Sequence, residues 1–244
     1  MSEQSKQGLS RRGFLKGTAG VGGGLAVASF ASAFGLNDNS VSAAHDRKDD
    51  VATIVNLAAT AETLATTSYY YTIKGNPFGL SNFQLAYFKL ALSSELYHLK
   101  FLESAGGKSL ASKFYVPEKF LSDFGVNTAT FIAAETAFTG AYIAATRRFA
   151  ELGESRLAAT TAQHAATEAE HLALSRLAGG FVPNPNALPA PIYYNVSDAV
   201  PTLGPFLQGA SGFIGPVDYP GEAAINDLLG DTKSVGVPTF TRVF

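Results

Sequence analysis

The chain has 244 residues, a formal net charge of −2, 16% charged residues and no cysteine. This length suffices for one domain with a complete core, and without a basic excess we expect no nucleic-acid partner. The lack of cysteine excludes disulfide frameworks, zinc ribbons, iron–sulfur clusters and thiol catalysis. Downstream of residue 50 there is no apolar stretch of about eighteen residues, so we expect this part of the chain to be soluble.

The first 43 residues resemble a signal for export by the twin-arginine pathway. The motif is Leu9-Ser10-Arg11-Arg12-Gly13-Phe14-Leu15-Lys16, followed by a mildly apolar segment rich in Gly, Ala and Val. Ala31-Ser32-Ala33 and Val41-Ser42-Ala43 are both candidate cleavage sites. The resemblance implies the twin-arginine export machinery as a partner and a periplasmic, extracellular or cell-envelope location. A basic tail or a marginal membrane anchor is the alternative. Because this pathway exports folded proteins, often with an inserted cofactor, it favours a cofactor-carrying domain.

The second segment, residues 44–180, divides into four predicted helices separated by glycine-containing loops. The helices span about 50–74, 82–105, 128–152 and 156–178. They begin after or at Asp49-Asp50, Ser81, Asn127 and Ser155. Such residues before a helix, with Gly after it and no Pro inside, are typical of helix ends. Two loops are short and predict antiparallel hairpins, whereas residues 106–127 are long enough to cross the whole bundle. The pattern predicts an all-α four-helix bundle with one long crossover between helices two and three.

The third segment, residues 181–244, contains nine of the 11 prolines and no sustained helical periodicity. We expect a largely irregular C-terminal extension that wraps the bundle or forms an oligomer contact, with short helices near 197–207 and 222–229. Full disorder is disfavoured because aromatic residues such as Tyr193 and Phe206 need apolar partners.

Two Glu-x-x-His pairs mark the second and fourth predicted helices. The pairs are Glu95/His98 and Glu168/His171, and they lie 73 residues apart. Glu62 and Glu135, in the first and third helices, are separated by the same 73 residues, and each precedes the pair of its own hairpin by 33. The shared offsets indicate an internal duplication of one helical hairpin. Solvated surface glutamates with two chance histidines would not explain them.

The spacing has a chemical reason, since residues i and i+3 of a helix lie on one face and present an oxygen and a nitrogen ligand to one point. Four carboxylates and two imidazoles are the ligand set of a carboxylate-bridged dinuclear site in a four-helix bundle. Such ligands suit two iron ions, with two manganese ions or a mixed pair as the alternative. Two divalent cations would also cancel the charge of four buried carboxylates. Either Glu95 and Glu168 or Glu62 and Glu135 bridge the metals. The predicted metal ligands and catalytic residues are Glu62, Glu95, His98, Glu135, Glu168 and His171.

Three further residues lie on the faces of the predicted ligands. Tyr69 and Tyr142 each follow a ligand glutamate by seven residues. They either hydrogen-bond ligand carboxylates or donate single electrons, or else they are core aromatics with a satisfied hydroxyl. His164, one turn before the last pair, either orients a ligand or donates a proton, or is a satisfied core histidine. Its counterpart in the repeat is Ala91. Glu170 is expected on the solvated face.

Residues 50–180 resemble the ferritin-like superfamily, with the ligand pattern of rubrerythrins, bacterioferritins and manganese catalases. Three segments are also similar to exported ferritin-like proteins related to plant desiccation-associated proteins. These segments are Ala61–Leu64, Glu135–Tyr142 and Glu168–His171.

The resemblance implies a dinuclear oxidoreductase that reacts with O2 or H2O2 as a peroxidase, ferroxidase or catalase. A peroxidase would need an external electron donor, because without cysteine there is no attached rubredoxin module. The alternative is a structural, stress-protective protein of the desiccation type whose metal site only stabilises the fold. Iron storage in a hollow cage is a third, less favoured possibility, and a homo-oligomer remains open.

Overall fold

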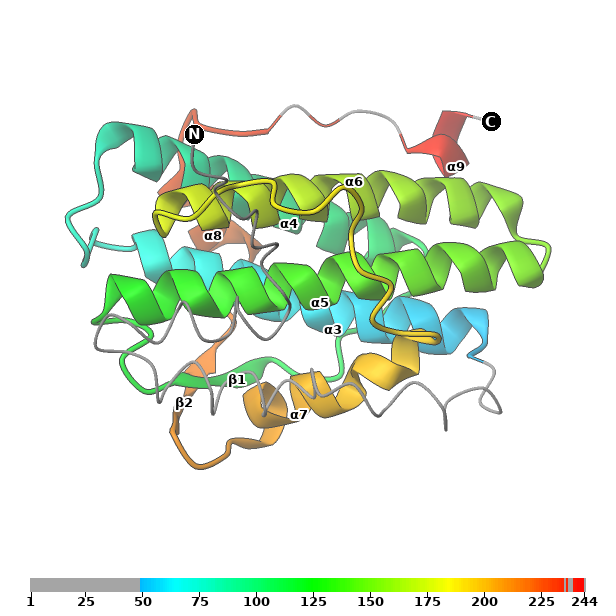
Figure 1. The fold of residues 1–244 in the computed structure, drawn as a ribbon, viewed down its shortest axis with the longest axis horizontal. Helices are drawn as coiled ribbons and strands as arrows, with labels where there is room; N and C mark the ends of the chain where they lie inside the picture. Colours follow the sequence, from blue (N-terminus) through cyan, green and yellow to red (C-terminus); the bar gives the residue numbers. More distant parts are fainter. Residues whose placement is uncertain (1–48, 235, 237–238, 244) are drawn as a thin grey trace, which may run out of the picture.

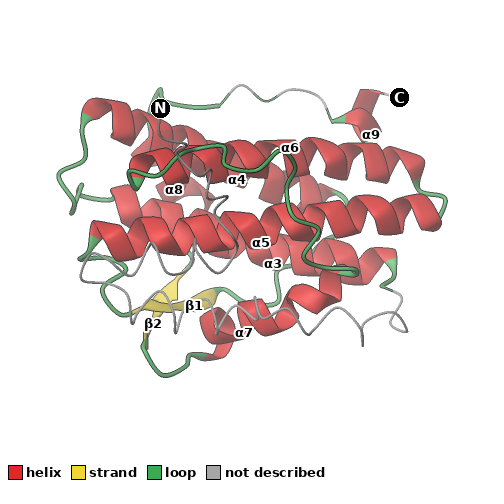
Figure 2. Ribbon diagram, viewed as in Figure 1, coloured by secondary structure: helices red, strands yellow, loops and turns green. Residues whose placement is uncertain are grey.

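The computed structural model describes residues 49–234, 236 and 239–243, so the predicted export signal at residues 1–43 lies outside the described residues. The described part is mostly helical with one small two-stranded sheet, as expected for an all-α bundle (Figure 2). Within it, no helix is both long and apolar enough to cross a membrane.

Four long helices lie side by side and form the body of the molecule (Figure 1). They are α3 (Val51–Ile73), α4 (Asn82–Ser104), α5 (Phe124–Glu151) and α6 (Ser155–Ala178). The closest packing is between α5 and α6 and between α3 and α4, so each half of the predicted duplication is a helical hairpin. The chain reverses direction within each hairpin, whereas α4 and α5 run the same way (Figure 1).

Two predicted helix starts are wrong, and both errors concern caps. Helix α5 begins earlier than predicted, because the Asp123 side chain accepts hydrogen bonds from the backbone of Gly125 and Val126. Asn127 lies inside this helix, buried, and its amide donates to the side chain of Thr72. Ser155 is already part of α6, and the residue before it makes no side-chain cap. Asp, Asn and Ser cap about equally well, so composition alone could not choose among neighbouring candidates.

The crossover and the C-terminal extension form a sheet that the sequence did not predict. Strand β1 (Lys113–Pro117) lies in the crossover and pairs antiparallel with β2 (Phe213–Asp218). Phe114 of β1 is fully buried against Leu203 and Phe206 of the extension. Both strands are short, so their apolar alternation gave little signal before they were paired.

The extension contains more regular structure than expected. The short helices predicted near 197–207 and 222–229 are present. Its helices are η2 (Val196–Ala199), α7 (Val200–Gln208), α8 (Glu222–Leu229) and α9 (Phe240–Val243).

Apolar side chains fill the bundle on both sides of a central polar layer. Tyr69, Phe88 and Phe131 belong to a cluster on one side of this layer, and Ile54 and Phe149 to a cluster on the other. Along α3 and α5 the two clusters are separated by the segments that carry the predicted ligand glutamates. The fold therefore holds these acidic residues in a dry interior between two hydrophobic regions.

Candidate metal centre

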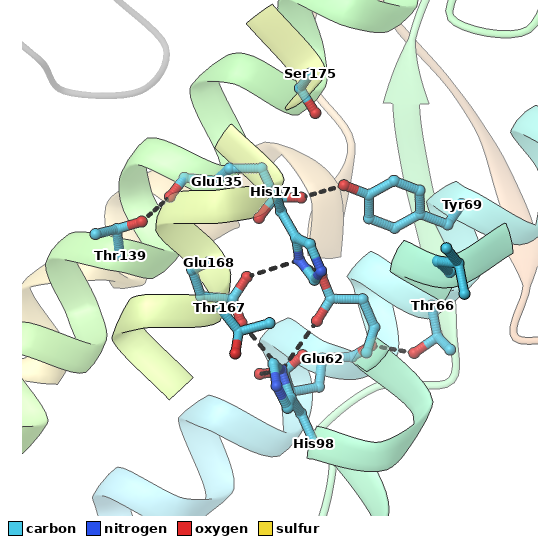
Figure 3. A network of polar contacts seen from close by, with 12 residues as sticks. Glu62, Thr66, Tyr69, His98, Glu135, Thr139, Thr167, Glu168, His171 and Ser175 are labelled. Carbon is cyan, nitrogen blue, oxygen red and sulfur yellow. Dashed lines mark hydrogen bonds and ion pairs between the residues drawn. The ribbon is translucent and has the colours of Figure 1, made fainter. Parts of the chain in front are cut away.

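The six predicted ligands meet in the interior of the bundle, and Figure 3 shows five of them, labelled, facing one another. Helices α3 and α5 each supply one glutamate, and α4 and α6 each supply one Glu-x-x-His pair. The four glutamates are at most 2% exposed, and both histidines are 5% exposed. Ionisable side chains are this deeply buried only when they are paired or bound to a cation.

The six side chains form two overlapping groups. One group is Glu62, Glu95, His98 and Glu168, and the other is Glu95, Glu135, Glu168 and His171. In each group every residue offers one ligand atom, and these atoms all lie within 4.8 Å of one another. Glu95 and Glu168 belong to both groups, so the arrangement has two positions that share two carboxylates.

The shared carboxylates direct different oxygens to the two histidines. Nδ1 of His98 lies 3.2 Å from Oε2 of Glu95 and 3.1 Å from Oε1 of Glu168. Nδ1 of His171 lies 2.8 Å from Oε1 of Glu95 and 3.4 Å from Oε2 of Glu168. Of the two bridging arrangements that the sequence left open, this geometry favours Glu95 and Glu168. Glu62 and Glu135 then each belong to one position only.

Many ligand atoms have no hydrogen-bond partner among the described residues, although they are buried. These atoms are both carboxylate oxygens of Glu95 and Glu168, Oε2 of Glu62 and of Glu135, and Nδ1 of His98 and of His171. Buried polar atoms in native proteins are almost always satisfied, and leaving one unpaired costs about 1–3 kcal/mol. A cation faced by all of them would satisfy them together. Carboxylate oxygens with imidazole nitrogens suit such a cation chemically. The residues present therefore fit a metal ion.

Mutual electrostatics separates the four carboxylates into two kinds. Burial, and then the charge of Glu95, raises the pKa of Glu62 and of Glu135 well above the ordinary value. Burial also raises the pKa of Glu95 and of Glu168, but the two histidines more than offset this and lower both. The protein alone thus favours neutral outer glutamates and ionised shared ones.

The two histidines behave in the opposite way. Burial lowers the pKa of His98 and of His171, but the neighbouring carboxylates outweigh it and raise both pKa values well above the ordinary one. Two imidazolium ions then balance two carboxylates, so the cluster is close to neutral when protons take the place of a cation.

The two tyrosines near the site hydrogen-bond the outer glutamates. The hydroxyl of Tyr69 donates to Oε1 of Glu135 at 2.5 Å, and that of Tyr142 donates to Oε1 of Glu62. The Tyr69 ring also stacks on Phe131 with 4.2 Å between centroids, so it packs as a core aromatic as well. Burial raises the pKa of both hydroxyls, which keeps them protonated as donors.

His164 lies beside the site without joining either ligand group. It is 3% exposed, and its ring stacks 4.4 Å from the ring of His98 and 5.0 Å from that of Tyr142. Nδ1 lies 2.8 Å from the carbonyl oxygen of Thr160. Glu170 is exposed, as expected from its helical position.

A pair of threonines near the site was missed. The hydroxyls of Thr66 and Thr139 donate to the carbonyl oxygens of Glu62 and Glu135, one turn before each in its own helix. These threonines are 73 residues apart, the offset of the ligands, so the repeat could have revealed them. Donation to the preceding turn satisfies a buried hydroxyl next to each outer glutamate.

Comparisons of the chain with protein-family models, with curated proteins and with solved structures find no match.

Proposed function

We propose that this chain is an exported, ferritin-like protein that holds two iron or manganese ions and reacts with O2 or H2O2. One observation carries the proposal: Glu95 and Glu168 each face both histidines with different oxygens. Shared carboxylates between two donor groups are what a dinuclear site in a helical bundle requires. The two hairpins with parallel central helices α4 and α5 support the ferritin-like assignment (Figure 1).

In this proposal each side chain has a defined task. Glu95 and Glu168 bridge the two positions, while His98 with Glu62 and His171 with Glu135 complete one position each. Tyr69 and Tyr142 fix the outer carboxylates by hydrogen bonds. Surrounding apolar residues exclude bulk water, which strengthens the electrostatic interactions inside the site. When bound, two redox-active ions about 3.5–4 Å apart would supply the two electrons that cleave an O–O bond.

The reactions that fit differ in where the electrons come from. Reduction of H2O2 to two molecules of water consumes two electrons and two protons. A peroxidase would take the electrons from an external donor, a ferroxidase from Fe(II), and a catalase from a second H2O2, which is oxidised to O2. The twin-arginine motif supports a periplasmic, extracellular or envelope location for any of them.

A structural, stress-protective role is the second candidate, and the burial of the site favours it. None of the six ligands is more than 5% exposed, as expected for a metal that only connects the two hairpins. In that case the protein would bind redox metal without turnover of O2, H2O2 or Fe(II).

Metal loading followed by consumption assays tests the proposal. The chain, expressed from residue 44, is loaded separately with Fe(II) and Mn(II) without oxygen, and metal content is measured by elemental analysis. Oxygen and peroxide consumption are then followed for the wild type, Glu135→Ala and the exposed control Glu170→Ala. We expect two ions per chain and turnover in the wild type and in Glu170→Ala, and loss of both in Glu135→Ala. Two ions without turnover would favour the structural role, and absence of bound metal would overturn both.

A further inference from the structure

The two halves of the duplicated site differ at His164. It lies four residues before Glu168 on α6, whereas the equivalent position on α4, four residues before Glu95, is Ala91. Both are buried. The imidazole of His164 packs on the His98 ring, on Tyr142 and on Phe101, with the Phe101 ring centroid at 5.4 Å. An ionisable ring therefore lies beside the position of His98, in a place where the repeat has only a methyl group.

The hydrogen bond of His164 defines which nitrogen carries its proton. Nδ1 lies 2.8 Å from the carbonyl oxygen of Thr160, and a carbonyl oxygen can only accept. Nδ1 is therefore the donor, and Nε2 presents a lone pair. Burial lowers the pKa of His164 to about 4, which keeps the ring in this neutral form at pH 7.

The lone pair on Nε2 has no donor from the chain. This atom is buried, and no described residue lies within hydrogen-bonding reach of it. Because Nδ1 faces the backbone of α6, Nε2 on the other side of the ring is directed away from that helix, into the bundle interior. His164 is also not a member of either group of ligand atoms that lie within 4.8 Å of one another. A buried acceptor of this kind is normally satisfied by an O–H or N–H group.

We propose that Nε2 of His164 accepts a hydrogen bond from a small O–H ligand, hydrogen peroxide, bound on the His98 side of the metal centre. Water has the same donor chemistry and is the competing occupant. Dioxygen has no proton to donate, so the proposal selects peroxide over O2 as the substrate. It rests on the proposed function, since a peroxide has a role here only beside a redox metal.

Two variants isolate the lone pair from the shape of the ring. His164→Phe keeps an aromatic ring for stacking but removes Nε2, whereas His164→Gln removes the ring and keeps a hydrogen-bond acceptor. Glu170→Ala, exposed on the same helix, is the matched control. Circular dichroism and metal content establish that each variant is folded and loaded before it is compared.

The first measurement needs no turnover. In the protein loaded with redox-inactive Zn(II), and in parallel in the metal-free protein, imidazole nitrogen resonances are followed by ¹⁵N NMR during titration with H2O2. We expect the Nδ1–H form of His164 and a saturable shift of Nε2 on adding peroxide. If Nε2 carries the proton, or if its resonance already shows a hydrogen bond in buffer and peroxide does not move it, the proposal is overturned.

The second measurement is steady-state kinetics with the iron- or manganese-loaded protein. One neutral hydrogen bond to the substrate corresponds to about a fivefold to tenfold change in affinity. We expect the KM for H2O2 to rise by about that factor in His164→Phe, to recover in His164→Gln and to stay unchanged in Glu170→Ala, with O2 consumption unaffected throughout. An unchanged KM in His164→Phe would overturn the proposal. A chain that binds no metal would instead refute the proposed function, while the metal-free titration would still decide the role of Nε2.

Discussion

The hydroxyl of Tyr69 donates a hydrogen bond to Glu135 across the interface between the two helical hairpins, at 2.5 Å. Tyr142 makes the reciprocal bond to Glu62. Tyr69 shares a helix with Glu62, and Tyr142 shares one with Glu135, so each hairpin orients the outer glutamate of the other. The candidate metal centre is therefore complete only when the hairpins are docked.

The reciprocal bonds predict that Tyr69→Phe and Tyr142→Phe weaken metal binding. Loss of a hydrogen bond that orients a ligand typically lowers metal affinity about 10-fold to 100-fold. We expect effects of similar size for the two variants, measured by competition with a chelator. Tyr71→Phe is the control, since its hydroxyl bonds the Asp218 carbonyl outside the site. Unchanged affinity in both site variants would show that the tyrosines are only packing residues.

The division into shared and outer glutamates predicts different metal losses. Glu95→Ala removes a ligand from both positions, so we expect it to abolish binding of both ions. Glu135→Ala removes a ligand from the His171 position, so metal content should fall sharply, and the residual metal should occupy the His98 position. Glu170→Ala should bind metal as the wild type does. Elemental analysis measures all three, and equal losses in Glu135→Ala and Glu170→Ala would refute the assignment of helix faces.

The raised pKa values predict how the stability of the metal-free protein depends on pH. Glu62 and Glu135 from an ordinary value of 4.5, and His98 and His171 from 6.5, hold protons more tightly in the folded state. The folded state then binds more protons than the unfolded chain, so the free energy of unfolding decreases as pH rises from these values. We expect the Tm of the metal-free protein to fall between about pH 6 and about pH 9.

Metal binding should show the opposite trend. A cation displaces the protons of these four groups, so its affinity increases with pH and binding releases protons. Calorimetric titrations in buffers of different ionisation enthalpy measure that release, and thermal melts with and without chelator measure the stability. Metal binding without proton release, or a metal-free Tm that rises over this range, would contradict the proposed protonation of the cluster.

The sheet between crossover and extension predicts that the extension stabilises the bundle. Phe114 of β1 is fully buried against residues of the extension, and Phe→Ala at such a site typically costs about 3–5 kcal/mol. Phe114→Ala should therefore lower the free energy of unfolding of the whole protein by about that amount. The adjacent Lys113→Ala should change it by less than about 1 kcal/mol, since its ion pair with Asp218 is exposed. Denaturant unfolding followed by circular dichroism measures both, and similar small effects would mean that the extension is not part of the cooperative unit.

Much of the helical part was predictable from local sequence. Gly, Ser and Asp placed the helix ends within a few residues, and the repeat offset of 73 identified the six residues that meet in the core. A duplicated offset works because two similar hairpins present equivalent positions to a common axis. The same offset contained Thr66 and Thr139, which the search for ionisable ligands passed over.

Tertiary features were not predictable in this way. The crosswise bonds of Tyr69 and Tyr142 depend on which hairpin each ring enters, and helical spacing alone does not determine that. The pairing of β1 with β2 joins residues about a hundred positions apart in two short segments. The choice of Glu95 and Glu168 as the shared carboxylates required the positions of individual oxygens.

Anomalous diffraction from crystals of the iron- or manganese-loaded protein tests the central claim most directly. We expect two peaks about 3.5–4 Å apart, both in contact with Glu95 and Glu168, one beside His98 and the other beside His171. A loaded protein whose ions lie on the surface, or which shows no ion between α4 and α6, would contradict it.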